Sequence, residues 1–231
     1  MTREDIFKVP VPERTESYSP VAHKAVIRRV ETQLQKNNLE IYSEDFKVAR
    51  DGKQVIGLMN IRYNGEKELG MQFAWQNSYD KSKPVAFSAG AHAWICMNGM
   101  IVGEIQYVRR HTGTVLEEIA GKIAVTVEQL TKRFTNTQIL TEKMKNVTVS
   151  KRAMAELAGR LYIEHEIITA TQLSVIKKEI IQPTFEPFKY ENLWSFYNHV
   201  TFALKEDHPS TYLQTHKKFH GFVEEQFGVL V

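Results

Sequence analysis

Residues 68–77 read ELGMQFAWQN, and this stretch decides the fold. Met71, Phe73 and Trp75 alternate along it with polar or small residues. A period of two is typical of a β-strand with one apolar face. The stretch therefore predicts a strand, and its surroundings decide what kind of sheet the strand joins.

The same alternation recurs on both sides of this strand, between turn-forming pairs of residues. An asparagine or aspartate followed by glycine favours tight hairpin turns, because both positions accept a positive φ. Such pairs occur at Asp51-Gly52, Asn64-Gly65 and Asn98-Gly99, and the loop SYDKSKP separates two further strands. We therefore expect residues 40–110 to form an antiparallel β-meander of about five strands.

A helix is predicted before the meander, and an extended arm before that helix. Ser19-Pro20 is a typical helix start, with serine as the cap and proline in the first turn. Ala22, Val26, Val30 and Leu34 then follow at helical spacing as far as about Asn37. Prolines 10 and 12 disfavour a helix over residues 1–19.

Helices dominate the rest of the chain. A long helix is expected from Thr114, capped by Thr112 or Thr114, to Phe134 or Lys145. Three shorter helices have caps at Ser150, at Thr169 or Thr171, and at Asn192, and a last helix follows Pro209. The predicted class is α+β: an N-terminal helix, the meander and then several helices. The predicted divisions are an arm (1–19), a core (20–146) and a C-terminal helical part (147–231) packed on the same domain.

The composition is that of a globular protein, with 42% apolar and 25% charged residues in a chain of 231. The single cysteine excludes an internal disulfide. No apolar run approaches the roughly 20 residues of a spanning helix, so we expect a cytoplasmic protein with no membrane partner. The net charge of +3 is compatible with nucleic acid but is weak evidence for it.

Motifs for nucleotide, metal or hydrolytic chemistry are missing from the sequence. There is no P-loop, GxGxxG, HExxH, CxxC or GxSxG, and we expect no cofactor and no metal. His216 and His220 share a helix face but lack a third ligand, which favours two partly exposed helix histidines. Cys96 lies too far along its strand from His92 to pair with it, which favours a buried structural cysteine.

The run from Arg109 to Thr112 is the most suggestive feature of the sequence. It lies where the last strand meets the long helix, and unpaired amides at a helix start suit an anion. Arg109 and Arg110 should point to opposite faces of the strand, so that at most one of them faces a given ligand. Two alternatives stay open: decoration of a sheet edge, or an ion pair between Arg110 and Glu104 or Glu118.

The same region carries a family resemblance. The stretch WICMNGMIVG, with the later RRHTG, resembles the Cys-x-Asn-Gly-Leu-Val-x-Gly…Arg-Arg-His-Thr-Gly signature of a family of phage- and plasmid-encoded proteins of unknown function. Met100 stands where that family more often has leucine. Three further stretches agree with the family: residues 14–34, 49–61 and 192–205. The resemblance marks six signature positions without a role: Cys96, Asn98, Gly99, Arg110, His111 and Thr112.

The predicted layout is also similar to the core of phage single-strand annealing recombinases, which hold single-stranded DNA along a basic groove in rings or filaments. We therefore hypothesise a non-enzymatic, homo-oligomeric protein that binds single-stranded nucleic acid, with annealing as its most specific form. The candidate contacts are Lys53, Arg62, Lys67, Arg109, Arg110, His111 and Thr112. Trp75 is the aromatic residue to consider for base stacking, although its alternation with Met71 and Phe73 favours a core position. The alternatives are an enzyme or small-ligand protein centred on the hairpin from Cys96 to His111, and a protein that blocks a host system.

Overall fold

The computed structural model describes the whole chain except residues 63–68, 94–104, 209 and 229–231. Its centre is an antiparallel sheet of five strands in the order β1-β2-β3-β4-β5, so every strand pairs with its neighbour in sequence. The strands are β1 (Glu40–Ala49), β2 (Gln54–Arg62), β3 (Leu69–Ser78), β4 (Val85–Ala93) and β5 (Ile105–Arg109). The predicted α+β meander is confirmed.

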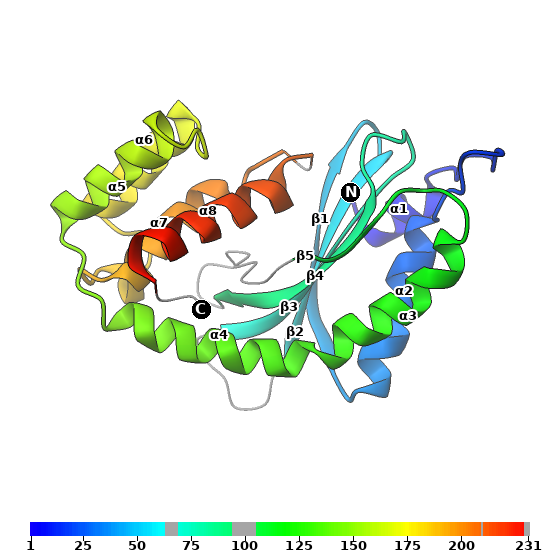
Figure 1. The fold of residues 1–231 in the computed structure, drawn as a ribbon, viewed down its shortest axis with the longest axis horizontal. Helices are drawn as coiled ribbons and strands as arrows, with labels where there is room; N and C mark the ends of the chain where they lie inside the picture. The colour runs from blue at the N-terminus through cyan, green and yellow to red at the C-terminus, as the bar shows by residue number, and fades with distance from the viewer. Residues whose placement is uncertain (63–68, 94–104, 209, 229–231) are drawn as a thin grey trace.

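Helices precede and follow the sheet (Figure 1). They are α1 (Arg3–Lys8), α2 (His23–Lys36), α3 (Val115–Glu128), α4 (Leu130–Lys145), α5 (Lys151–Ile163), α6 (Ala170–Ile181), α7 (Leu193–Leu204) and α8 (Tyr212–Phe227), with a 3-10 turn η1 at Glu186–Phe188. In Figure 1, α3 and α4 run end to end beside the sheet, and α2 lies next to α3. The predicted long helix is therefore present, with a break at Gln129.

One face of the sheet forms the main core. Met71, Phe73 and Trp75 are fully buried there, in one cluster with the apolar residues of α2, α3, α4 and α7. Across from Trp75, β2 carries Gly57, and a Cβ at Gly57 would lie 2.2 Å from the indole nitrogen. Glycine is therefore required at this position, because the indole occupies the space of a side chain.

The opposite face of the sheet is also covered. Ile56, Leu58, Ala74 and Ala86 form a second buried cluster with residues at the start of α8, Tyr212 and Leu213. Burial on both faces fixes the register of the meander, because a slip of one residue would exchange the two sets of side chains.

The N-terminal segment differs from the prediction. Residues 3–8 form the helix α1 inside the expected extended arm, because the side chain of Thr2 and that of Asp5 build a reciprocal capping box. The helix α2 begins at His23 instead of Pro20, after Ala22, and no side chain caps it. Ser19 has another role, which the functional region explains.

Most predicted helix starts are confirmed. Ser150, Thr169 and Asn192 accept hydrogen bonds from the first turns of α5, α6 and α7. Thr114 occupies the cap position of α3, but its side chain makes no capping bond.

The Asp51-Gly52 pair forms the predicted tight turn, with both φ angles positive (53° and 86°) and a bond from Lys53 N–H to Arg50 C=O. The pairs at 64–65 and 98–99 lie outside the described residues.

Candidate nucleic-acid interface

A cavity of about 730 Å³ lies at the connection between β5 and α3. Residues 17–18, the β3–β4 loop and the junction 108–112 form its walls. Four of the lining residues are cationic: Lys81, Lys83, Arg109 and Arg110. Among the described residues that line the cavity, none is acidic. We call this site the junction cavity.

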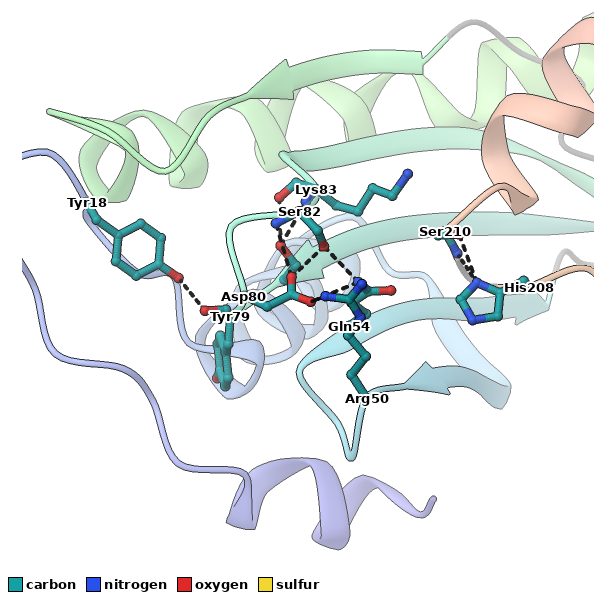
Figure 2. A network of polar contacts seen from close by, with 10 residues as sticks. Tyr18, Arg50, Gln54, Tyr79, Asp80, Ser82, Lys83, His208 and Ser210 are labelled. Carbon is teal, nitrogen blue, oxygen red and sulfur yellow. Dashed lines mark hydrogen bonds and ion pairs between the residues drawn. The ribbon is translucent and has the colours of Figure 1, made fainter.

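The β3–β4 loop that supplies two of these lysines is pinned by Asp80 (Figure 2). The Asp80 carboxylate accepts hydrogen bonds from Arg50 (2.8 Å), from Gln54 (2.9 Å) and from the backbone N–H of Ser82 (3.0 Å). Burial opposes ionisation of Asp80, yet the bonds from Ser82 and Gln54 and the charge of Arg50 lower its pKa to about 2. The loop is therefore fixed by a carboxylate that is ionised at neutral pH.

The side chains of the two lysines have different neighbours. Ser78 holds the backbone of Lys83 through two hydrogen bonds of 2.8 and 3.0 Å, and in Figure 2 the Lys83 side chain extends away from Asp80. The ammonium of Lys81 lies 4.7 Å from the centre of the Tyr18 ring, at cation–π distance. Both lysines line the junction cavity, and two hydrogen bonds fix the backbone of Lys83 there.

Sheet register explains why these lysines meet the arginines. Val85 in β4 pairs with Arg109 at the end of β5. In an antiparallel pair, the residues before Val85 must therefore lie beside those after Arg109. Sequence reasoning missed Lys81 and Lys83, although the loop SYDKSKP and the hairpin register together contain the signal.

The two arginines have different surroundings. Arg109 forms an ion pair with Glu118 of α3, with Nε 3.2 Å from Oε2, and Thr114 donates to the same carboxylate over 2.7 Å. Arg110 is exposed and has no ion pair among the residues that the structure describes. Both arginines line the cavity, because β5 ends at Arg109 and strand alternation does not extend to Arg110. Of the two alternative partners of Arg110, Glu118 pairs with Arg109 instead, and Glu104 lies outside the described residues.

His111 lines the cavity, but it is buried and takes part in a network of hydrogen bonds. Its Nε2 donates to Asn77 Oδ1 over 2.7 Å. Asn77 Nδ2 in turn donates to Val21 C=O (2.6 Å) and to His23 Nδ1 (2.9 Å), and His23 Nε2 donates to Gly52 C=O (3.0 Å). Each donor in this network has an acceptor when His23 and His111 are both neutral, with the proton of each ring on Nε2.

Burial acts in the same direction on both histidines. It lowers the pKa of His111, and together with the neighbouring His111 it lowers the pKa of His23 to about 4. A neutral, buried His111 supports the junction through Asn77, which differs from the expected contact between His111 and an anion. The sequence did not reveal this positioning role of Asn77, because Asn77 only continues the buried face of β3 by one step.

Ser19 connects the start of α2 to the same junction. Its backbone N–H donates to His111 C=O over 2.7 Å, and its hydroxyl donates to Gly113 C=O over 3.2 Å. The serine expected to cap a helix therefore holds residues 111–113 in place.

The other predicted contacts are dispersed. Thr112 is exposed and lines the cavity, whereas Lys53 lies in the β1–β2 turn and does not line it. Arg62 stands at the far end of β2, over the ring of Tyr42 (5.0 Å). Lys67 and the signature positions Cys96, Asn98 and Gly99 lie outside the described residues, so the structural reading of Cys96 stays a prediction.

Two further candidate groups are core residues. Trp75 is fully buried, which removes it as a stacking platform. His216 is also buried, beside the ring of Tyr212, instead of partly exposed as expected. Over the described part of the chain, no cluster of three potential metal ligands occurs and no helix is long and apolar enough to cross a membrane.

Comparison with known proteins identifies a family for this chain, but the description of that family names no activity. A family model described as "Domain of unknown function (DUF932)" matches residues 11–217. Neither a curated protein nor a solved structure matches the chain. The matched range contains the whole sheet, α2 and the junction cavity.

Proposed function

The chain belongs to the DUF932 family, and we propose that this protein binds single-stranded nucleic acid at the junction cavity, without catalysing a reaction. The observation that carries the proposal is the convergence of four cationic side chains on one concave site. Glu118 neutralises Arg109, which leaves Lys81, Lys83 and Arg110 as the lining cations without an ion pair among the described residues. Phosphates of a nucleic-acid backbone are the ligand that such a site attracts most strongly.

The shape of the site favours a single strand over a duplex. Reading a duplex in its major groove requires a helix or a β-ribbon that protrudes from the protein. Here the cationic side chains line a hollow between the β3–β4 loop and the junction that precedes α3. A hollow of this kind receives one backbone, and its contacts go to phosphates, so we expect little sequence preference.

The wider setting is part of the same proposal. The signature around Cys96 resembles that of phage- and plasmid-encoded proteins, which supports an origin in a mobile element. The order of one helix, a meander and a long helix is similar to that of single-strand annealing proteins, which supports annealing as a homo-oligomer. Such a protein would meet its nucleic acid in the cytoplasm of a bacterial host.

Fluorescence anisotropy with a labelled oligonucleotide of about 16 nucleotides tests the proposal. The key variant is K81A/K83A/R110A, which removes the three lining cations that have no ion pair in the described part of the chain. Three exposed charge contacts at about 0.5 kcal/mol or more each predict a loss of about tenfold or more in affinity at low salt. A duplex of the same sequence should bind more weakly than the single strand.

The matched control is R152A/K177A/K178A, which removes the same net charge from exposed positions on α5 and α6. It should bind like the wild type. If both triple variants lose affinity equally, binding follows net charge alone and the junction cavity is not the site. A wild-type protein that binds no single strand at low salt contradicts the proposal outright.

A further inference from the structure

A second basic site lies between α2 and α3. It is a groove of about 540 Å³, and three of its lining residues are the cations Lys24, Arg28 and Arg29. Among the described residues that line this groove, none is acidic. We call it the α2–α3 groove.

The spacing of the cations along α2 places them on the side of the helix that lines the groove. Lys24 and Arg28 are four residues apart and so share a face of the helix, with Arg29 beside them. Val26, Ile27 and Val30 fill the opposite face and are fully buried. Arg28 and Arg29 have no ion pair among the described residues, whereas Glu31, the acidic residue of α2, is bound by Arg3. The positive charge of the groove is therefore not compensated locally.

Small side chains open the groove to a bulky ligand. Ala22, Ala25 and Ala120 line the groove together with the cations, and Thr32 and Gln33 add polar groups toward the C-terminal end of α2. From Lys24 to Gln33 the helix rises about 13 Å, which exceeds the size of one phosphate group.

Two chain segments run from the junction cavity directly to this groove. Residues 17–18 line the cavity and Ala22 lines the groove, while Thr112 lines the cavity and Ala120 of α3 lines the groove. Ser19 binds these two segments together through His111 and Gly113. The two basic sites are thus neighbours on a rigid frame.

We infer that the α2–α3 groove is a second phosphate-binding subsite, which receives the same nucleic-acid strand after it leaves the junction cavity. This inference rests on the proposed function and adds to it the path of the strand along α2. Arg28 and Arg29 bind backbone phosphates there, and Thr32 and Gln33 donate hydrogen bonds to phosphate or sugar oxygens. The subsite makes affinity depend on strand length, because a short strand occupies only one of the two sites.

The test compares labelled single strands of about 4 and about 16 nucleotides by anisotropy over a range of salt concentrations. The variant R28A/R29A should bind the short strand like the wild type. For the long strand it should lose about tenfold in affinity, and its salt slope should fall by about 1.4, the share of two phosphates. The charge-preserving variant R28K/R29K should retain the wild-type slope, and K177A/K178A, which removes two charges from exposed positions on α6, serves as the control for net charge.

Several outcomes would overturn the subsite. If wild-type protein binds both lengths with the same affinity and slope, the groove takes no part, although the junction cavity still binds nucleic acid. The same holds if R28A/R29A binds the long strand as tightly as the wild type does. Equal loss on both lengths would show that the arginines act on the junction cavity itself. Absence of binding to either length by the wild type would overturn the proposed function together with the subsite.

Discussion

Asn77 accepts a hydrogen bond from His111 over 2.7 Å, and this contact joins the central sheet to the strand-to-helix junction. Asn77 continues the face of β3 that carries Phe73 and Trp75, so its amide lies at the edge of the main core with no exposed surface. The amide also reaches His23 in α2. One side chain therefore positions three elements around the junction cavity.

Replacing Asn77 should destabilise the whole protein. Asn77→Ala removes the hydrogen-bond partner of three groups: Val21 C=O, His23 Nδ1 and His111 Nε2. An unsatisfied buried polar group costs about 1–3 kcal/mol. We expect the free energy of unfolding in urea to fall by about 3 kcal/mol or more. Asn37→Ala is the control, since Asn37 is exposed and bonds only within its own helix end. A loss of equal size in the two variants would contradict the central role of Asn77.

Gly57→Ala should disturb the core through Trp75. The added Cβ would meet the indole at 2.2 Å, so the ring must move, and overpacking of this kind costs about 1–3 kcal/mol. The expected result is a lower melting temperature with a red-shifted tryptophan emission. Gly121→Ala in α3 has open space around its Cβ and should instead stabilise the helix by about 0.5–1 kcal/mol. An unchanged emission spectrum in Gly57→Ala would refute the packing described for Trp75.

Stability should fall as the pH falls, and His216 accounts for part of the change. Burial lowers the pKa of His216 to about 3, below the ordinary 6.5, so the folded protein holds this histidine neutral. Between pH 6.5 and 3, His216 is protonated in the unfolded chain but stays neutral in the folded protein. The stabilisation is thus complete above pH 6.5 and is lost as the pH falls through that window.

His216→Leu removes this contribution. In acid, its free energy of unfolding should decrease less steeply than that of the wild type, by about 1.4 kcal/mol per pH unit. Urea titrations at several pH values between 7 and 4 measure the slope. The control His208→Leu removes an exposed histidine and should retain the wild-type slope. An unchanged slope in His216→Leu would contradict the burial of a neutral imidazole.

Glu118→Gln should strengthen binding. The Glu118 carboxylate neutralises Arg109, and hydrogen bonds from Thr114 and Arg109 lower the pKa of Glu118, which keeps it ionised. Removing this charge adds a fourth uncompensated cation to the junction cavity. Affinity for a single strand at low salt should rise by about threefold, as expected for one exposed charge contact. Weaker binding by a fully folded Glu118→Gln would mean that the Arg109 pair itself shapes the site.

Periodicity was sufficient to predict the sheet and its order. The alternation in β3 and the glycine turn at 51–52 both predict local geometry, and neighbouring strands joined by short turns pair with each other. The helix caps at Ser150, Thr169 and Asn192 are local in the same sense. By contrast, α1 depends on a single capping box, and the proline-dotted arm around it predicts an extended chain.

Long-range contacts account for what the sequence did not predict about the site. The partner of Arg109 lies nine residues further on, in α3, and strand alternation does not reveal which arginine faces it. The sequence predicts that His111 contacts an anion, whereas in the structure it is buried and hydrogen-bonded to Asn77, 34 residues earlier. The pairing of β4 with β5 places the lysines of the β3–β4 loop beside the junction. The sequence predicts this proximity only once the register of the hairpins is known.

The salt dependence of binding by Arg110→Ala tests the central claim most directly. Arg110 is the exposed arginine of the junction cavity without an ion pair among the described residues, so it should contact one phosphate. Titration of a labelled single strand at several salt concentrations should give a slope lower than that of the wild type by about 0.7, equally for strands of different sequence. The matched variant Lys177→Ala, which removes an exposed cation of α6 without an ion pair among the described residues, should keep the wild-type slope. An Arg110→Ala protein that folds normally and retains the wild-type slope would contradict the assignment of the junction cavity to nucleic-acid phosphate.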